Sequence, residues 1–179
     1  MKNIVKVFGI CLMFIFCIGC SLGNTPTSAT ERLLARYNTN DEEIVVELDD
    51  YVNESDLTDE QSGKYKDIYL KQFKDMKYEI KEEVIDGDTA TVTAQITVYD
   101  YYKATEDAND YLANNADEFK TDGVYDESLF TDYKLEQLDK VNDTVDYTID
   151  FTLTKVDNEW VVNDLTQEQL EKIHGVYAY

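Results

Sequence analysis

Apart from its many carboxylates, the chain has few side chains that could do acid–base, nucleophilic or metal chemistry. It has one histidine, His174, and its three cysteines are Cys11, Cys17 and Cys20. Histidine is a frequent general base and metal ligand near neutral pH, so His174 is considered first. It stands directly before Gly175 near the end of an expected closing helix. There a cation complements the helix dipole and a glycine caps the end. We expect this helix-end role, with general base as the alternative.

No catalytic or metal-binding constellation stands out among the other groups. A Ser-His-Asp triad would need the same histidine, and no serine of the mature chain lies in a G-x-S-x-G turn. Asp-Gly occurs at Asp86-Gly87 and at Asp122-Gly123, but calcium loops placed on these glycines put Val84 or Leu129 where oxygen ligands are required. The sequence therefore predicts no catalytic residue, no metal site and no cofactor. An enzyme is the less favoured interpretation, with a buried carboxylate such as Asp100, or His174, as proton carrier.

The amino terminus has the pattern of a secretory signal. Two lysines precede an uncharged, mostly apolar stretch over residues 7–18, which ends at Gly19-Cys20. Twelve helical residues rise about 18 Å, well short of the roughly 30 Å hydrocarbon core, so removal is favoured over a permanent membrane span. With a small residue before Cys20 and the uncharged residues 21–24 after it, the segment resembles the signal of bacterial lipoproteins.

This resemblance implies that residues 1–19 are a signal peptide and that the Cys20 thiol is acylated with diacylglycerol, with palmitate as a typical chain. Two acyl chains suffice for stable anchoring. The expected location is thus the extracytoplasmic face of the cell membrane, with an ordinary secreted soluble protein as the alternative. The mature chain keeps no free thiol, which removes disulfides and cysteine nucleophiles from consideration.

Charge restricts the partners of the mature chain. Loss of residues 1–19 removes two of the 16 basic residues and none of the 38 acidic ones, which takes the net charge from −22 to −24. Nucleic acid is excluded, because binding a polyphosphate requires clustered lysine and arginine. The same charge repels anionic headgroups, so membrane contact is expected through the lipid alone. Basic peptides, cations and envelope proteins are the favoured partners, although solvated helix faces also account for the acidity.

The mature chain is long enough for one compact core. Residues 20–29, which hold the only proline, are expected to be the acylated cysteine and a linker, and residues 30–179 a single α+β domain. Apolar positions spaced by three and four after residue 58 predict one buried helical face, and two more helices are expected within residues 103–142. Four capping boxes predict helix starts at Ser28/Glu31, Thr39/Glu42, Thr58/Gln61 and Thr166/Gln169.

Two hairpins are expected, because the apolar period changes to two after the third helix and again after residue 144. In the first hairpin we expect a three-residue loop at 86–88 that pairs Val84 with Ala90, since a two-residue loop would put the apolar faces on opposite sides. In the second, a two-residue loop at 157–158 pairs Leu153 with Val162. Each hairpin has one apolar and one threonine-rich face. This predicts an antiparallel sheet of about four strands, packed by helices on one face.

This order of elements resembles the cone-shaped nuclear-transport-factor-2-like fold. The segments 86–92, 99–102 and 171–175 are more narrowly similar to uncharacterised small lipoproteins of Gram-positive bacteria. The resemblance implies the cone but no activity, because that fold hosts dehydratases, isomerases, peptide binders and transport factors.

Aromatic residues supply the candidate binding surface. Tyr99, Tyr101 and Tyr102 cluster where the second strand ends, and Trp160 lies in the second hairpin. Tyrosine combines apolar area with a polar tip and is common in binding surfaces, although a core edge is the alternative. The sequence thus favours a non-catalytic binding module for a small ligand, a peptide or an envelope protein. A hydrolase or isomerase is the alternative, a purely structural role is a third, and weak self-association through the exposed sheet stays open.

Overall fold

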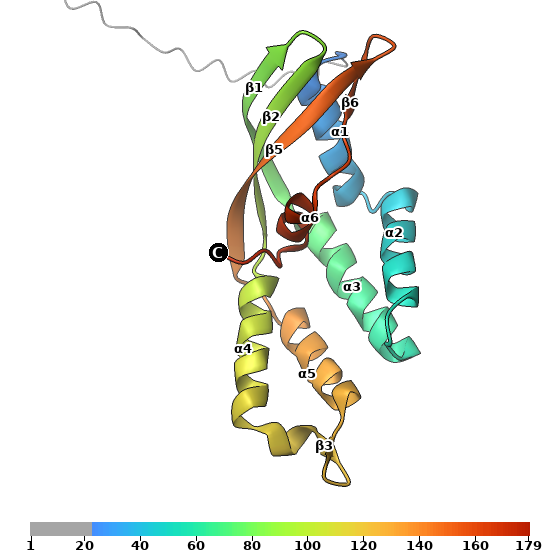
Figure 1. Cartoon of the computed structure of the whole chain (residues 1–179), viewed down its shortest axis with the longest axis vertical. Helices are drawn as coiled ribbons and strands as arrows, with labels where there is room; N and C mark the ends of the chain where they lie inside the picture. The colour runs from blue at the N-terminus through green and yellow to red at the C-terminus, as the bar shows by residue number, and fades with distance from the viewer. Residues whose placement is uncertain (1–22) are drawn as a thin grey trace, which may run out of the picture.

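A computed structural model describes residues 23–179, in which six α-helices accompany one four-stranded antiparallel sheet (Figure 1). The predicted signal peptide and Cys20 lie outside the described residues. The helices are α1 (Pro26–Asn38), α2 (Glu42–Asn53), α3 (Asp59–Asp75), α4 (Tyr101–Asn114), α5 (Glu127–Asp139) and α6 (Gln167–His174). The strands of the sheet are β1 (Lys77–Asp86), β2 (Thr89–Tyr99), β5 (Thr144–Val156) and β6 (Glu159–Val162).

The sheet has the strand order β1-β2-β5-β6, and its central pair runs in unbroken register from Thr89↔Thr154 to Tyr99↔Thr144. The even positions of β2 and the odd positions of β5 from Tyr147 to Leu153 are buried, and α1, α3 and α6 pack against that face. The opposite face carries exposed or half-buried threonine, glutamine and aspartate side chains. The predicted α+β class and the one-sided sheet are therefore confirmed, because residues of alternate polarity point to opposite faces of a strand.

The second hairpin forms as predicted. Leu153 pairs with Val162, and the two-residue loop is Asp157-Asn158. Both loop residues have positive φ angles, 50° and 69°. This is the left-handed backbone that a twisted two-residue hairpin needs and that aspartate and asparagine tolerate.

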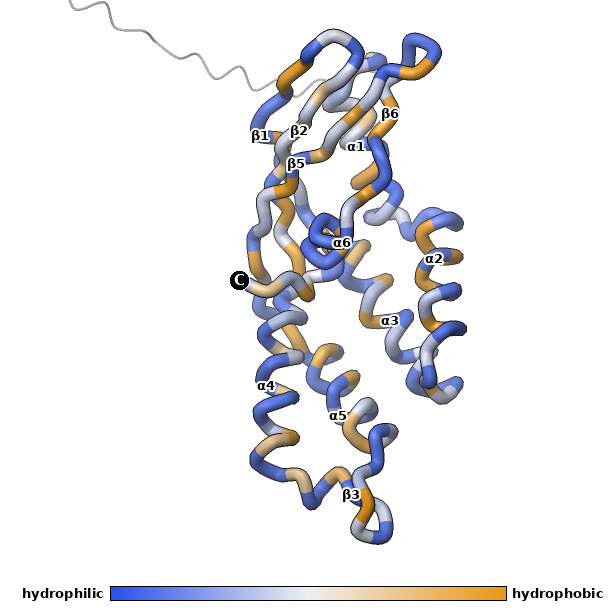
Figure 2. The backbone as a smooth tube through the Cα atoms, in the orientation of Figure 1, coloured by the Kyte–Doolittle hydropathy of each residue, from blue (hydrophilic) through white to orange (hydrophobic). Residues whose placement is uncertain are grey.

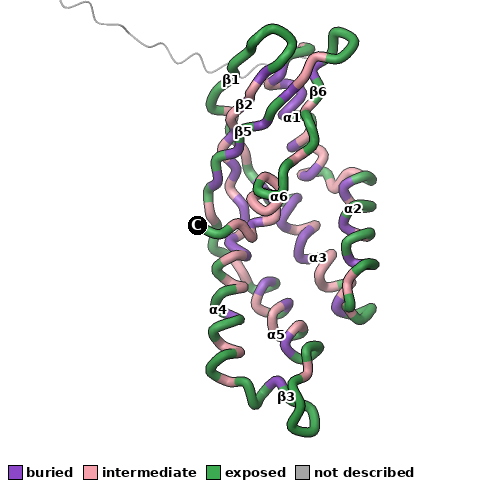
Figure 3. Tube along the Cα trace, viewed as in Figure 1, coloured by how far each residue is buried: buried purple, intermediate pink, exposed green. Residues whose placement is uncertain are grey.

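The first hairpin corrects the predicted register. Asp86 pairs with Thr89, so the loop has two residues, and Val84 faces Thr91 rather than Ala90. A bulge at Lys81 then shifts the register and places apolar opposite apolar farther along the strands, with Ile80 paired with Ala94. One inserted residue exchanges the two faces of a strand. Val84 and Ile85, on opposite faces of β1, are both exposed at this end of the hairpin, which Figure 3 shows in green.

Two of the four predicted capping boxes are confirmed, at Thr58/Gln61 and Thr166/Gln169. The predicted start at Ser28 is wrong: α1 is capped by Thr25, and Ser28 is the residue that bonds back to it. Proline at the first helical position accounts for the earlier start, because its fixed φ suits a helix and its missing N–H would have been unpaired there.

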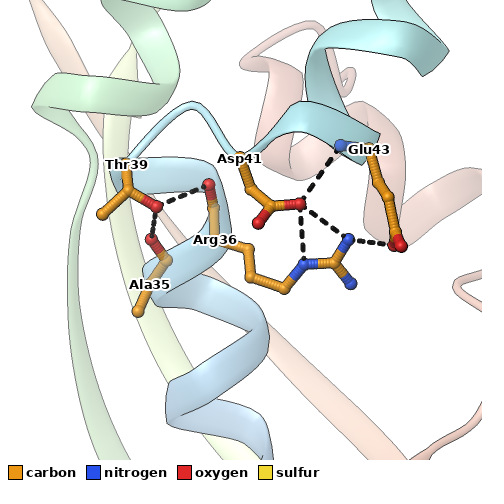
Figure 4. Close-up of polar contacts among 5 residues, drawn as sticks. All are labelled: Ala35, Arg36, Thr39, Asp41 and Glu43. Carbon is orange, nitrogen blue, oxygen red and sulfur yellow. Dashed lines mark hydrogen bonds and ion pairs between the residues drawn. The ribbon is translucent and has the colours of Figure 1, made fainter.

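The predicted start at Thr39 is also wrong, because this residue ends α1 rather than beginning α2. Its hydroxyl donates to the carbonyl oxygen of Ala35 at 2.9 Å. The cap of α2 is Asp41, which accepts from the backbone of Glu43 at 3.1 Å and also pairs with Arg36 (Figure 4). Serine, threonine and aspartate all bond readily to nearby backbone, so spacing alone chose the wrong residue.

The fold begins earlier than the predicted boundary at residue 30. The side-chain oxygen of Asn24 accepts from the backbone N–H of Trp160 at 3.1 Å, and its amide donates to the carbonyl oxygen of Asn158. Pro26 and Ala29 are buried, and α1 packs against β6. The expected linker over residues 20–29 is therefore too long at its carboxyl end.

The two helices expected between the hairpins are α4 and α5, and they form an arm beyond the sheet (Figure 1). They are joined by a 3-10 turn, η1 (Ala116–Phe119), and a small ribbon, β3 (Lys120–Thr121) with β4 (Val124–Tyr125). The arm has its own core of Ala108, Phe119 and Phe130, separate from the main core. Apolar and polar residues alternate along its helices and along α2 and α3 (Figure 2). Among the described residues, no helix has the length and hydropathy needed to span a membrane.

Candidate functional site

A cleft of about 890 Å³ lies between α2, α3, α5 and α6. This volume falls in the range of clefts that enclose a drug-sized ligand, roughly 300–1,000 Å³. Its floor is apolar, because the surrounding helices each point an apolar face, formed by residues three and four positions apart, into the cleft. Leu48 of α2, Phe73 of α3 and Leu135 and Leu138 of α5 all line it and are buried. The cleft can therefore take up apolar surface from a ligand.

Stacked tyrosines form one wall. Tyr65 of α3 lies between Tyr51 of α2, at 5.4 Å between ring centroids, and Tyr69 of α3, at 4.5 Å. Tyr69 continues the row to Tyr101, which it meets edge-on at 5.7 Å. Burial raises the pKa of Tyr69 to about 12, and burial with the two neighbouring phenols raises the pKa of Tyr65 further. These hydroxyls stay protonated at neutral pH, so the wall offers ring faces together with hydrogen-bond donors.

His174 also lines the cleft, at the end of α6. Its ring packs against Tyr69 and Phe73, with centroids at 5.5 and 5.4 Å. Burial lowers the pKa of His174 to about 4, so the imidazole is neutral near pH 7. The predicted helix end is confirmed, since Gly175 caps α6 with φ at 73°. The expected cation at that end is wrong, because the half-buried ring packs against the aromatic wall and is neutral near pH 7.

Gln72 fixes the place of His174. This side chain is fully buried on α3, donates to the carbonyl oxygen of His174 at 2.9 Å and accepts from the backbone N–H of Tyr99 at 2.8 Å. It thereby joins α3, the end of β2 and the end of α6, whose backbone groups would otherwise be unpaired in the interior. These hydrogen bonds connect the three elements at the back of the cleft.

Asp100, the carboxylate suggested as a proton carrier, has a structural position. It is buried, caps α4 by accepting from the backbone of Lys103 at 2.9 Å, and accepts from the Tyr179 hydroxyl at 2.7 Å. It lines a smaller hollow of about 390 Å³ beside α4 and α5 and is not among the residues that line the main cleft. The structure thus separates the two suggested proton carriers, Asp100 and His174.

The four predicted surface aromatics do not form one surface. Tyr101 and Trp160 are core residues, exposed by 1% and 7%. The hydroxyl of Tyr99 donates to Asp75 at 2.8 Å, and Tyr102 packs on Tyr179 with centroids at 5.5 Å. The strand ends at Tyr99 and helix α4 starts at Tyr101, and Tyr101 lies on the buried side of that helix.

The rim of the cleft is acidic. Glu47 of α2, Asp56 in the loop before α3, Glu127 of α5 and Glu171 of α6 line it, and Lys134 is the one lysine among the lining residues. These carboxylates come from separate elements. In the part of the chain that the structure describes, no three His, Cys, Asp or Glu side chains lie together as a metal site would require.

Sequence reasoning identified His174 but missed the rest of this cleft. The spacing of Tyr65, Tyr69 and Phe73 predicts one helical face, but it does not distinguish a face that packs in the core from one that lines a cleft. Nothing in the sequence indicated that α2 and α5 would stand on opposite sides of that face.

No family model matches the chain, and no curated protein matches it. A solved structure from Bacillus subtilis, described as a "putative lipoprotein (ycdA)", aligns with 15% identity and a TM-score of 0.41. The alignment covers 83% of this chain and 46% of the Bacillus chain. The chain therefore spans about half the length of that protein.

Proposed function

We propose that the chain is a lipid-anchored protein of the extracytoplasmic face of the cell membrane, and that its domain binds a ligand in the cleft between α2, α3, α5 and α6. The anchor rests on the sequence around Cys20, which lies outside the described residues. The nuclear-transport-factor-2-like cone stays a prediction. The ligand is a small molecule or a peptide segment, since the cleft has the size for either.

One observation supports binding most directly: a cleft of about 890 Å³ combines an apolar floor with a row of protonated phenols. Ligand sites are typically concave and mostly apolar, with a few polar groups that orient the ligand. The hydrogen bonds of Gln72 hold the back of the cleft in place. A preformed site binds more tightly because little ordering is required on association.

The geometry supports binding over catalysis. A general base works best with a pKa near the operating pH, and the pKa of His174 is lowered to about 4 by burial. A neutral imidazole between two aromatic rings acts as part of an apolar wall. The buried Asp100 is occupied as a helix cap in another part of the structure.

A neutral apolar dye tests the cleft as a binding site. The fragment 23–179 would be titrated with N-phenyl-1-naphthylamine, whose fluorescence rises in apolar surroundings. Two variants fill the cleft from different sides: Thr131→Trp on α5 and Ser55→Trp in the loop after α2. Thr152→Trp, on the exposed face of the sheet, is the matched control.

We expect saturable dye binding by the wild type and by Thr152→Trp, and at least about tenfold weaker binding by both cleft variants, which corresponds to about 1.4 kcal/mol. Thermal unfolding would confirm that all three variants are folded. Equal dye binding by wild type and both folded cleft variants would contradict the proposal.

A further inference from the structure

The carboxylates at the rim lack cations within the described chain. The ion pairs found there involve none of Glu47, Asp56, Glu127 or Glu171. Nearby lysines are engaged elsewhere: Lys66 pairs with Asp49 at 2.5 Å, and Lys172 pairs with Glu168 at 2.6 Å. The rim therefore presents several uncompensated negative charges around an apolar floor.

The same lining can hold positive charge in two ways. Carboxylates attract ammonium and guanidinium groups directly, and the exposed ring of Tyr51 attracts cations through its quadrupole. Lys134 is the one lysine that opposes this, and its ammonium lies 6.0 Å from the centroid of the Phe130 ring. An anionic ligand would meet four carboxylates at the rim and a net charge of −22 over the whole chain.

The distribution of the rim charges indicates more than one cation on the ligand. The four carboxylates belong to α2, the loop before α3, α5 and α6, so they stand around the cleft instead of converging on one point. A ligand with a single amine would pair with one or two of them. A peptide with an apolar face for the floor and lysine or arginine on its other faces would pair with several at once.

We infer that the ligand of this cleft is a basic, amphipathic peptide segment, bound with its apolar side chains on the floor and its cations at the acidic rim. The inference rests on the proposed function and names the ligand class for the same cleft. Helices that lay one apolar face into a groove are a recurring mode of peptide recognition. Complementary charge at the rim adds to the association rate and selects against anionic competitors.

Model peptides of one design test the inference with fragment 23–179. A peptide of about 12 residues carries leucine on one helical face and lysine elsewhere. A second has glutamate in place of lysine, a third has the leucine/lysine sequence scrambled, and dodecylamine supplies a single cation on an apolar chain. Affinities would be measured by displacement of N-phenyl-1-naphthylamine from the cleft, and checked by calorimetry.

We expect the patterned leucine/lysine peptide to displace the dye at least about tenfold more effectively than the other three ligands. If the glutamate peptide, the scrambled peptide or dodecylamine binds as tightly as the patterned leucine/lysine peptide, the inference is overturned. The proposed function would still stand in that case, because the dye binds in the cleft. If the dye does not bind in the cleft at all, the proposed function fails first, and the two failures are thereby distinguished.

Matched charge variants locate the contribution of the rim. The triple variant Glu47→Gln, Glu127→Gln, Glu171→Gln removes rim charge, and Glu82→Gln, Glu106→Gln, Glu159→Gln removes as much from exposed positions elsewhere. We expect the rim variant to bind the leucine/lysine peptide at least about tenfold more weakly and the control to stay within about twofold of wild type. Equal weakening by both would mean diffuse attraction to an acidic protein and would overturn the inference.

Discussion

Gly175 lies so close to Gln72 that any side chain at position 175 would overlap the Gln72 amide and the carbonyl oxygen of Tyr99. The residue also has a φ of 73°, which side chains other than glycine rarely adopt. Three elements meet at this point: α3 through Gln72, β2 through Tyr99, and the end of α6. The contact holds the back of the cleft together, and it can be tested with single substitutions.

Gly175→Ala should lower the free energy of unfolding by more than about 2 kcal/mol, because a methyl group adds steric overlap to backbone strain. Urea unfolding would measure the change. Gly63→Ala is the matched control: it lies within α3 with open space around it, so the same substitution should raise stability by about 0.5–1 kcal/mol. Similar stabilities for the two variants would mean that the packing at Gly175 is looser than described.

Gln72→Leu should lower the free energy of unfolding by roughly 2–6 kcal/mol. The backbone N–H of Tyr99 and the carbonyl oxygen of His174 would lose a partner in the interior, at about 1–3 kcal/mol for each unpaired group. Gln167→Leu removes an exposed amide that bonds to Glu171 at 3.0 Å, and should change stability by less than about 0.5 kcal/mol. Equal losses would argue against the role of Gln72.

His174 should make the fold less stable at acid pH. Its folded pKa of about 4 is below the ordinary value near 6.5, so between these values the unfolded chain takes up a proton that the folded chain does not. The stability that the neutral, buried His174 contributes is fully present above pH 6.5. It is lost as the pH falls from 6.5 toward 4, by up to about 3 kcal/mol. The difference in unfolding free energy between wild type and His174→Phe, measured across this range, isolates it from the carboxylates.

The pKa itself can be read directly, because the chain has one histidine and therefore one set of imidazole signals in a proton NMR titration. A midpoint near 6.5 in the folded protein would show that the ring is in water and would contradict its place against Tyr69 and Phe73.

Phe119→Ala should loosen the arm without unfolding the sheet. The buried Phe119 ring packs against Phe130, with ring centroids 5.4 Å apart, in a core separate from the main one. Removing the ring should therefore cost about 3–5 kcal/mol of stability within the arm alone. Hydrogen exchange would then speed up in α4 and α5 and remain slow in β2 and β5. Phe151→Ala, in the main core, is the contrast and should accelerate exchange throughout.

Local structure, such as helix caps and turns, could be predicted where a few neighbouring residues determine it. Thr58 and Thr166 cap their helices as expected, and Asp157-Asn158 forms the expected turn. The one-sided sheet followed from strict alternation in β2 and β5. The bulge at Lys81 was not predictable, because inserting a residue in the strand and lengthening the loop both align the same apolar faces.

The candidate site was less predictable, because it depends on how distant elements stand together. Tyr51, Leu135 and His174 come from three helices, and no local pattern indicates that they surround one space. Tyr101 is a core residue and not part of a binding surface, because a helix starts at this position and turns its side chain inward. Trp160 lies in the core and not at a binding surface; large aromatic residues occur in both places, so the residue type alone does not decide between them.

The hydrogen bonds of Asn24 to the second hairpin connect the amino-terminal end of the described chain to the loop at Asn158. Asn24 comes four positions after Cys20 in the sequence, and a chain of this length reaches at most about 14 Å. With the proposed anchor at Cys20, the loop at Asn158 is tethered close to the lipid, and the arm of α4 and α5 lies at the other end of the long axis (Figure 1). The proposed anchor would then leave the arm at the end of the domain that is farther from the lipid.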